Sequence, residues 1–329
     1  MKHCSVFLTV LLVLCVNIGL VSAQDIEPTD EEQYMLELIN RARLDPPAEG
    51  EILANHPNQN IQFAYDFFNV DRQTIIDDFA SYMPVPPLAF NDSLIRAARR
   101  HTKDMKDNNF QDHTGTDDTT PGDRIEEAGY EWWTYGENVY SYAESVDHAH
   151  AGFVVDWGVA SLGHRKNTLE YADEPRWMEI GIGILRTGSA KLLAAKRLRR
   201  DVHISAGNTT TADQVGPMLV TIDFAAPFQY SPQVLGVVYQ DLNENLAYDI
   251  GEGLGGVTIN VQDSNKSTAT YSSGGYSIPF ALGGEYTLIA TGGLLEETIE
   301  KTFTIGLDNV KVDFRLGEGT DISDWALFD

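Results

Sequence analysis

Apolar residues recur at the spacing of an α-helix in several parts of the first 160 residues. The first such segment opens at Thr29 with the capping-box sequence Thr-Asp-Glu-Glu, and its apolar positions are Met35, Leu38, Ile39 and Ala42. We expect this helix to stop at Pro46-Pro47, because proline is poorly tolerated inside a helix. Residues 51–87 then mix asparagine, proline and aromatic residues, which favours an irregular insertion with one short helix.

Three further helices are predicted from cap residues followed by apolar positions. A helix should begin at Asn91 or Asp92, and a brief one should begin at Thr120, where a cap precedes proline, and end at Gly129. A fourth should begin near Ser145.

The pattern changes to strict alternation at Glu179–Ile184 and again at Met218–Phe224, which predicts two β-strands. Helices followed by strands in this order indicate an α+β domain built in layers. We assign it to residues 24–229, with a hinge at Ser231-Pro232.

Short β-rich runs separated by Gly, Asn and Ser turns fill residues 233–318, which we therefore expect to form a small all-β sandwich. The runs are Val234–Tyr239, Val257–Val261, Tyr276–Phe280, Tyr286–Ala290, Thr302–Ile305 and Val310–Leu316. Residues 319–329 form a C-terminal tail, either a docking peptide or a frayed end.

The N-terminus is typical of a secretory signal peptide. Lys2 precedes an apolar run, and the small-residue sequence Val21-Ser-Ala23 predicts cleavage after residue 23. Both cysteines, Cys4 and Cys15, fall in this segment, so the secreted chain should have no disulfide and no cysteine nucleophile. No later apolar run is long enough to span a bilayer.

The formal net charge of −26 adds a constraint on partners. Such a charge disfavours nucleic acid, which binds basic surfaces, and it suits a soluble monomer outside the cell or at its surface. The basic insertion at residues 191–200 is an exception, and it predicts either a docking site for a polyanion or a solvated loop.

The candidate chemistry of the first domain lies in His113, Glu137 and His164, each of which is close to a glycine. We expect the three side chains to meet in one open cleft. Two imidazoles and a carboxylate can hold a zinc-like ion and leave one position open for water. The alternative is a polar network that only fixes the loops. His101 falls on an apolar helical stripe and is predicted to be a core residue, whereas one of His148 and His150 could reach the cleft edge.

A calcium site is predicted in the second domain. Side-chain oxygens occur at the first, third, fifth, ninth and twelfth places of an EF-hand-like loop, and the seventh place offers a backbone carbonyl. These places are Asp241, Asn243, Asn245, Asp249 and Glu252, with Ala247 at the seventh. Leu246 stands where an EF-hand has glycine, and an ion-free Asp/Asn-rich turn is the alternative.

The first domain resembles the CAP superfamily of cysteine-rich secretory, antigen 5 and pathogenesis-related proteins, in a cysteine-free bacterial form. The motifs that carry the resemblance are Asn40-Arg-Ala-Arg43, Leu88-Ala-Phe-Asn91, His113-Thr-Gly115, Gly136-Glu137-Asn138, Gly163-His164-Arg165 and Ile180-Gly-Ile-Gly183. The resemblance implies a three-layer α-β-α sandwich whose cleft carries two histidines, able to hold a divalent metal, and two acids. His113, Glu137 and His164 match three of these residues, whereas Ala160 stands at the second acid.

The second domain resembles the B-type repeats of bacterial surface adhesins, through its calcium-loop sequence followed by Gly255-Gly-Val257. Three functions remain open. The chain is a secreted protein that binds an extracellular lipid, peptide, glycan or protein in its cleft, or a metal-dependent hydrolase of peptide or cell-wall material, or a purely adhesive surface protein. The motifs of the common hydrolases, His-Glu-x-x-His and Gly-x-Ser-x-Gly, do not occur in the sequence, so we favour binding over catalysis.

Overall fold

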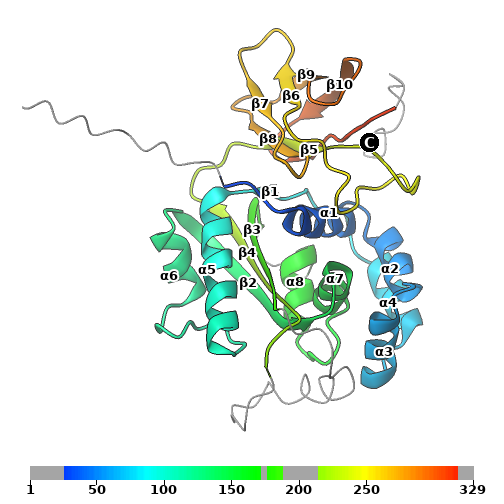
Figure 1. Ribbon diagram of the computed structural model, residues 1–329, viewed down its shortest axis with the longest axis vertical. Helices are drawn as coiled ribbons and strands as arrows, with labels where there is room; N and C mark the ends of the chain where they lie inside the picture. The colour runs from blue at the N-terminus through cyan, green and yellow to red at the C-terminus, as the bar shows by residue number, and fades with distance from the viewer. Residues whose placement is uncertain (1–25, 172–175, 188–213, 318–329) are drawn as a thin grey trace, which may run out of the picture.

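The computed structural model describes residues 26–171, 176–187 and 214–317 (Figure 1). The predicted signal peptide, the basic insertion and the C-terminal tail lie outside these residues. The described chain has the expected mixed α/β content in its first part, and its last part consists of strands. No helix in these ranges is long and apolar enough to cross a membrane.

The four predicted helices are present with the predicted caps. They are α1 (Asp30–Leu44), α5 (Asp92–Asn108), α6 (Pro121–Glu127) and α7 (Val146–Val155). Their caps are Thr29, Asn91, Thr120 and Ser145, and each cap side chain accepts a backbone N–H of the first turn. Local sequence therefore determined where these helices begin.

The prediction of an irregular segment at residues 51–87 was wrong, because three short helices occupy most of it. They are α2 (Pro46–Ala54), α3 (Gln59–Phe68) and α4 (Arg72–Ala80). Each begins after an Asp or Asn cap, and the Pro46-Pro47 pair opens α2 instead of only ending α1. Buried apolar side chains, among them Leu53, Ile61 and Phe79, join these helices to the core of the first domain.

The first domain is built on a sheet with the strand order β1-β3-β4-β2. The strands are β1 (Ala89–Phe90), β2 (Trp132–Ala143), β3 (Glu179–Arg186) and β4 (Met218–Pro227). The sequence predicted β3 and β4 but missed β2, an edge strand with polar and aromatic residues on both faces and two register irregularities.

Helices pack on both faces of this sheet (Figure 1). On one face, the Thr102 hydroxyl of α5 lies 2.9 Å from Gly183 O and 2.9 Å from the Thr221 hydroxyl. The other face carries the isoleucines of β3, which join α1 and α7 in the main core. The glycines between those isoleucines let α5 approach, because a Cβ on Gly181 would lie 2.0 Å from the Leu94 carbonyl carbon.

The second domain contains two sheets, ordered β10-β9-β6-β7 and β11-β5-β12, and β8 also pairs with β5. The strands are β5 (Gln233–Tyr239), β6 (Thr258–Val261), β7 (Ser267–Ala269), β8 (Gly275–Pro279), β9 (Gly284–Thr291), β10 (Ile299–Ile305), β11 (Val310–Lys311) and β12 (Phe314–Arg315). The predicted run Val310–Leu316 is split in two, because the Asp313 carboxylate accepts the Val237 N–H at 3.0 Å and interrupts the ladder.

A buried ionic cluster joins the two domains. Lys311 of β11 lies 2.8 Å from a Glu37 carboxylate oxygen of α1 and also pairs with Asp313. Beside it, the Asn309 amide donates to the backbone oxygens of Pro87 and Met178, both at 2.9 Å. One ammonium group therefore pairs with carboxylates from both domains, of which that of Glu37 is nearly buried and that of Asp313 is partly exposed.

We predict that Lys311→Met destabilises the protein by about 3 kcal/mol, because it leaves the nearly buried Glu37 carboxylate without a cation. The measurement is urea unfolding followed by fluorescence. Lys103→Met serves as the matched control, since Lys103 forms an exposed pair with Asp107 and its loss should leave the unfolding midpoint unchanged. Equal midpoints for the Lys311 variant and the control would contradict the prediction.

Candidate functional site

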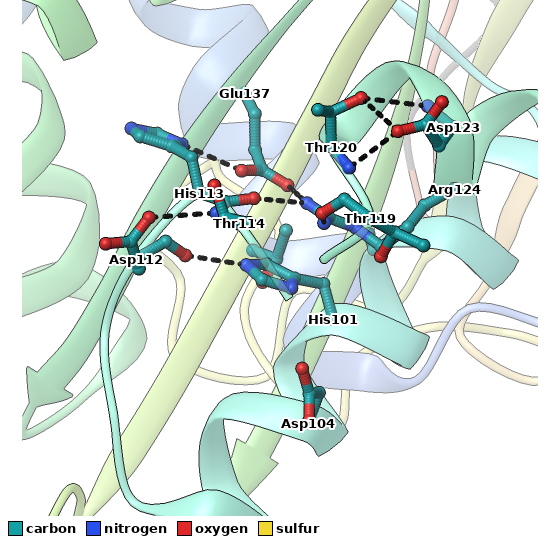
Figure 2. A network of polar contacts seen from close by, with 12 residues as sticks. His101, Asp104, Asp112, His113, Thr114, Thr119, Thr120, Asp123, Arg124 and Glu137 are labelled. Carbon is teal, nitrogen blue, oxygen red and sulfur yellow. Dashed lines mark hydrogen bonds and ion pairs between the residues drawn. The ribbon is translucent and has the colours of Figure 1, made fainter. Parts of the chain in front are cut away.

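The candidate site is centred on Glu137, a buried carboxylate of the edge strand β2. Its Oε1 lies 2.8 Å from His113 Nδ1, and its Oε2 accepts a hydrogen bond of 2.5 Å from Arg124 Nη2 (Figure 2). The Glu137 side chain is 1% exposed, whereas that of His113 is 55% exposed. The buried carboxylate thus holds a solvent-accessible imidazole by one of its two ring nitrogens.

Arg124 also fixes the backbone around this pair. Its guanidinium donates to Thr119 O at 2.9 Å and to His113 O at 3.1 Å. The capping box formed by Thr120 and Asp123 begins α6 and sets Arg124 one turn into that helix. The loop that carries His113 is therefore tied to α6 and β2 at once. The hydrogen bond to Glu137 raises the pKa of the His113 imidazole, although burial acts in the opposite direction.

A second carboxyl group, that of Asp223, belongs to the strand β4, next to β2. Asp223 and Glu137 face each other in the antiparallel pairing of β2 with β4. Asp223 is completely buried, and neither of its carboxyl oxygens accepts a hydrogen bond from the described residues. Burial and the neighbouring Glu137 carboxylate raise the pKa of Asp223 well above its usual range, while Arg124 lowers it. Asp223 is therefore the proton-holding member of a carboxyl pair.

His164 is held in a similar way by a different carboxylate. Its Nδ1 lies 2.7 Å from Asp156 Oδ1, and the other oxygen of Asp156 accepts the backbone N–H groups of His164 and Arg165 at 2.9 and 3.2 Å. Asp156 ends α7 in the left-handed conformation, with φ of 59°. It thereby caps the helix α8 (Gly163–Leu169) from outside. The His164 side chain is 25% exposed.

The structure thus brings His113 and Glu137 together and pairs His164 with Asp156. Two hydrogen bonds from side chains to backbone oxygens connect α8 to β2. The Asn138 side-chain amide donates to His164 O at 3.1 Å, and the Asn167 side-chain amide donates to Glu137 O at 3.3 Å. In the described ranges, no three His, Cys, Asp or Glu side chains are grouped so that they could hold a metal. The convergence of both imidazoles on one ligand stays a prediction.

Sequence reasoning missed three residues of this site, namely Arg124, Asp156 and Asp223. Only Asp223 had a recognisable signal, because a carboxylate in the interior of a buried strand requires a special reason. Ala160 stands at the position expected for a second acid, and the carboxyl group that the structure places opposite Glu137 is that of Asp223, on β4.

Three other histidines of the described residues are buried. His101 is buried as predicted, and its Nε2 lies 2.8 Å from Asp112 O (Figure 2). His150 is buried against Glu49 at 2.8 Å. Burial alone would raise the pKa of Glu49, but His150 and Arg41 together lower it to about 2. His148 is also buried, and burial lowers its pKa to about 4.

The predicted calcium residues gather in one loop after β5. The amides of Asn243 and Asn245 donate to the same Asp249 oxygen at 2.8 and 2.7 Å. Asp241 accepts the N–H of Asn245 at 3.1 Å. Glu252 accepts the backbone N–H groups of Leu242 and Asp249, both at 2.9 Å.

Backbone geometry supports the comparison with an EF-hand loop at its sixth place. Leu246 has φ of 65°, the left-handed conformation for which glycine is normally used. Asp241 accepts its N–H at 2.9 Å. The Ala247 N–H is bonded to Asn245 Oδ1 at 2.8 Å.

We predict that Asp223→Asn stabilises the protein at pH 7 by about 1 kcal/mol or more, because a neutral amide can donate to Glu137 without holding a proton. The unfolded state ionises at the ordinary Asp pKa of 3.8, whereas the folded Asp223 ionises only at higher pH. The native carboxyl therefore lowers stability as pH rises above 3.8. The stability gained by Asp223→Asn should therefore vanish near pH 3.8.

The measurement is urea unfolding of both proteins at several pH values. Asp263→Asn, at an exposed turn of the second domain, is the control that removes one charge elsewhere. A gain that persists unchanged in acid, or a loss of stability at pH 7, would contradict a protonated Asp223.

Comparison with known proteins places these residues in a family context. Residues 36–187 match the model of CAP, the cysteine-rich secretory protein family. The uncharacterized protein YkwD of Bacillus subtilis (strain 168) is 33% identical over 103 residues, which are 31% of this chain and 37% of that protein. The chain thus spans little more than a third of the relative that it matches.

Two solved structures show weaker likeness. An extracellular protein containing an SCP domain from Bacillus anthracis str. Ames matches over 51% of this chain and 40% of that chain, with 24% identity and a TM-score of 0.29. A chain of a type II cohesin–X-dockerin complex from Acetivibrio cellulolyticus covers 25% of this chain and 52% of its own, with 19% identity and a TM-score of 0.20. These TM-scores are too low to support an argument about function. The match over residues 36–187 supports a CAP domain in this chain, and His113, Glu137 and His164 all lie within it.

Proposed function

We propose that the chain is a secreted, non-enzymatic binding protein whose CAP domain takes up an extracellular ligand around His113, Glu137 and His164. One observation carries the proposal. Each of the two imidazoles is accessible to solvent, and each is held at Nδ1 by a buried carboxylate, at 2.8 Å in one case and 2.7 Å in the other. Their Nε2 atoms have no partner among the described residues and are left to bind a ligand.

The same arrangement suits a divalent metal of the zinc type. Metal-binding histidines commonly present one nitrogen to the metal while a carboxylate holds the other and fixes the tautomer. His113 and His164 would be the ligands. Glu137 would orient His113 instead of binding the metal, because both of its oxygens are already engaged. When bound, such an ion would offer an open position to an oxygen or nitrogen of the ligand.

The contacts of Glu137 favour binding over hydrolysis. A general base must be free to take a proton from water, but this carboxylate is neutralised by Arg124 and hydrogen-bonded to His113. Asp156 is likewise fully engaged by His164 and by the first turn of α8. The site is therefore better suited to holding a ligand than to activating water.

We predict that His113→Ala and His164→Ala each weaken zinc binding at least tenfold, and that Glu137→Gln weakens it about 10–100-fold by releasing the His113 ring. Isothermal titration of the full chain with Zn²⁺ measures these changes. His56→Ala is the control, because His56 is half-buried and contacts Asn58 away from the site. Zinc binding that is equal in all four variants would contradict the proposed ligands.

The hydrolase alternative is tested with the same proteins. The zinc-loaded chain is incubated with peptide and cell-wall substrates, and no turnover is expected. If turnover is observed and His164→Ala abolishes it, the function is hydrolysis and not binding alone.

We further infer that the second domain, which resembles adhesin B-type repeats, is a calcium-stabilised stalk or adhesive module. Asp241, Asn243, Asn245, Asp249 and Glu252 would supply side-chain oxygens, and Ala247 a carbonyl. The left-handed turn at Leu246 supports this assignment, because it keeps the loop in the form that an EF-hand loop needs even without glycine.

Calcium is therefore expected to raise the melting temperature of the second domain within the full chain. At a calcium concentration of a hundred times the Kd, the stabilisation should be about 2.7 kcal/mol. Calorimetry with calcium and with a chelator measures it. Asp249→Asn and Glu252→Gln should abolish the shift, whereas the exposed control Asp263→Asn should keep it. An identical melting curve with calcium and with chelator would contradict the proposed calcium site.

A further inference from the structure

A cavity of about 740 Å³ lies between the two domains, away from the imidazole site. From the first domain it is lined by the N-terminal end of α5, the α6–β2 turn and the start of β3. The hinge and the end of β8 complete it, with Phe228, Tyr230 and Pro279 among the lining residues. Cavities of this size at domain boundaries commonly hold small ligands.

The most buried charged group of this cavity is Glu179, which is 8% exposed. Its carboxylate accepts three hydrogen bonds, from the Tyr130 hydroxyl at 2.7 Å, from the Asn91 amide at 3.1 Å and from the Gln233 amide at 3.2 Å. Asn91 is also the N-cap of α5, so that helix end contributes only a partial positive charge beside the Glu179 carboxylate and not a full counter-ion. The two domains thus cooperate to hold an acidic group at the cavity wall.

All three partners of Glu179 are neutral. Among the described residues, no Lys, Arg or His forms an ion pair with this carboxylate, in contrast to the buried acids Glu37, Glu49 and Glu137, each of which has a cationic partner or an imidazole. Burial raises the pKa of Glu179, and its three hydrogen bonds oppose that rise. A buried carboxylate without a counter-ion, facing a cavity, is complementary to a cation.

We propose that this cavity is a binding site for an organic cation, a guanidinium or alkylammonium group, with Glu179 as its counter-ion. The remaining wall suits such a group. Phe228 is 72% exposed, and together with Tyr230 it offers aromatic surface for a cation–π contact. Glu131 adds a second carboxylate to the lining, and the chain's net charge of −26 attracts cations. This cation site is independent of the function proposed for the imidazole site.

The experiment titrates the full chain with Nα-acetyl-argininamide and with Nα-acetyl-citrullinamide (argininamide and citrullinamide below), which have nearly the same shape, but only the first carries a positive charge. Argininamide should bind with a Kd of about 1 mM or tighter, and citrullinamide at least tenfold more weakly. A capped pentapeptide, Gly-Gly-Arg-Gly-Gly, distinguishes the two sources of the cation. Tighter binding of the pentapeptide than of argininamide assigns the site to a peptide side chain, and weaker binding assigns it to a free small molecule.

Glu179→Gln should weaken argininamide binding at least tenfold, whereas Glu300→Gln, at an exposed position of β10 that does not line the cavity, should leave it unchanged. Phe228→Ala provides a variant on the surface that should fold normally and weaken binding severalfold. The proposal is overturned if argininamide does not bind, if citrullinamide binds equally well, or if neither Glu179→Gln nor Phe228→Ala changes the Kd.

Discussion

The candidate site depends on the buried ion pair between Arg124 and Glu137. The guanidinium and the carboxylate are each 1% exposed, so each would be costly to bury without the other. Arg124 holds the His113 loop by its backbone, while Glu137 holds the same residue by its ring. The pair also acts on Asp223 of the neighbouring strand, because burial and the Glu137 carboxylate raise the pKa of Asp223 whereas Arg124 lowers it. One buried charge pair therefore joins α6, β2, β4 and an exposed imidazole.

His164 follows the same principle with a different helix arrangement. One oxygen of Asp156 contacts the His164 ring, and the other accepts the N–H groups of the first turn of α8. The same carboxylate therefore both caps that helix and orients the imidazole. Successive residues of a strand point to opposite faces, and here Glu137 contacts the α6 side while Asn138 contacts α8. The edge strand β2 therefore contacts both segments that carry an imidazole, through the Glu137 side chain to the His113 ring and through the Asn138 side chain to the His164 backbone.

Much of the fold could be predicted from the sequence because its signals are local. The caps at Thr29, Asn91, Thr120 and Ser145 each lie within a few residues of the helix that they begin. The helix α8 was missed for the opposite reason, since its N-cap residue is Leu162 and its capping carboxylate comes from Asp156. The strand β2 was missed because an edge strand that carries polar contacts on both faces has no simple alternation.

The candidate site could likewise be predicted only where its signals are local. His113 and Glu137 are each close to glycine and are recognisable in sequence, whereas Arg124 and Asp223 contribute only through strand register and helix packing. Register between distant strands arises from the whole hydrophobic pattern and cannot be read at a single residue. Only one short helix was expected in residues 51–87, because the three helices at residues 46–80 begin at asparagine and aspartate caps in a segment whose composition resembles a loop.

The contact between the domains gives the loop at residues 241–252, for which we propose calcium binding, a role beyond the stability of its own domain. Tyr248, which lies within that loop, is buried, and its ring centroid is 6.5 Å from that of Tyr34 on α1. The Tyr34 hydroxyl in turn donates to Asp147 of α7 at 2.9 Å. The loop therefore packs against the same helix whose Glu37 binds Lys311. An ion that rigidifies the loop would also rigidify this contact, so that the second domain would hold the CAP domain in one orientation instead of acting as a flexible tether.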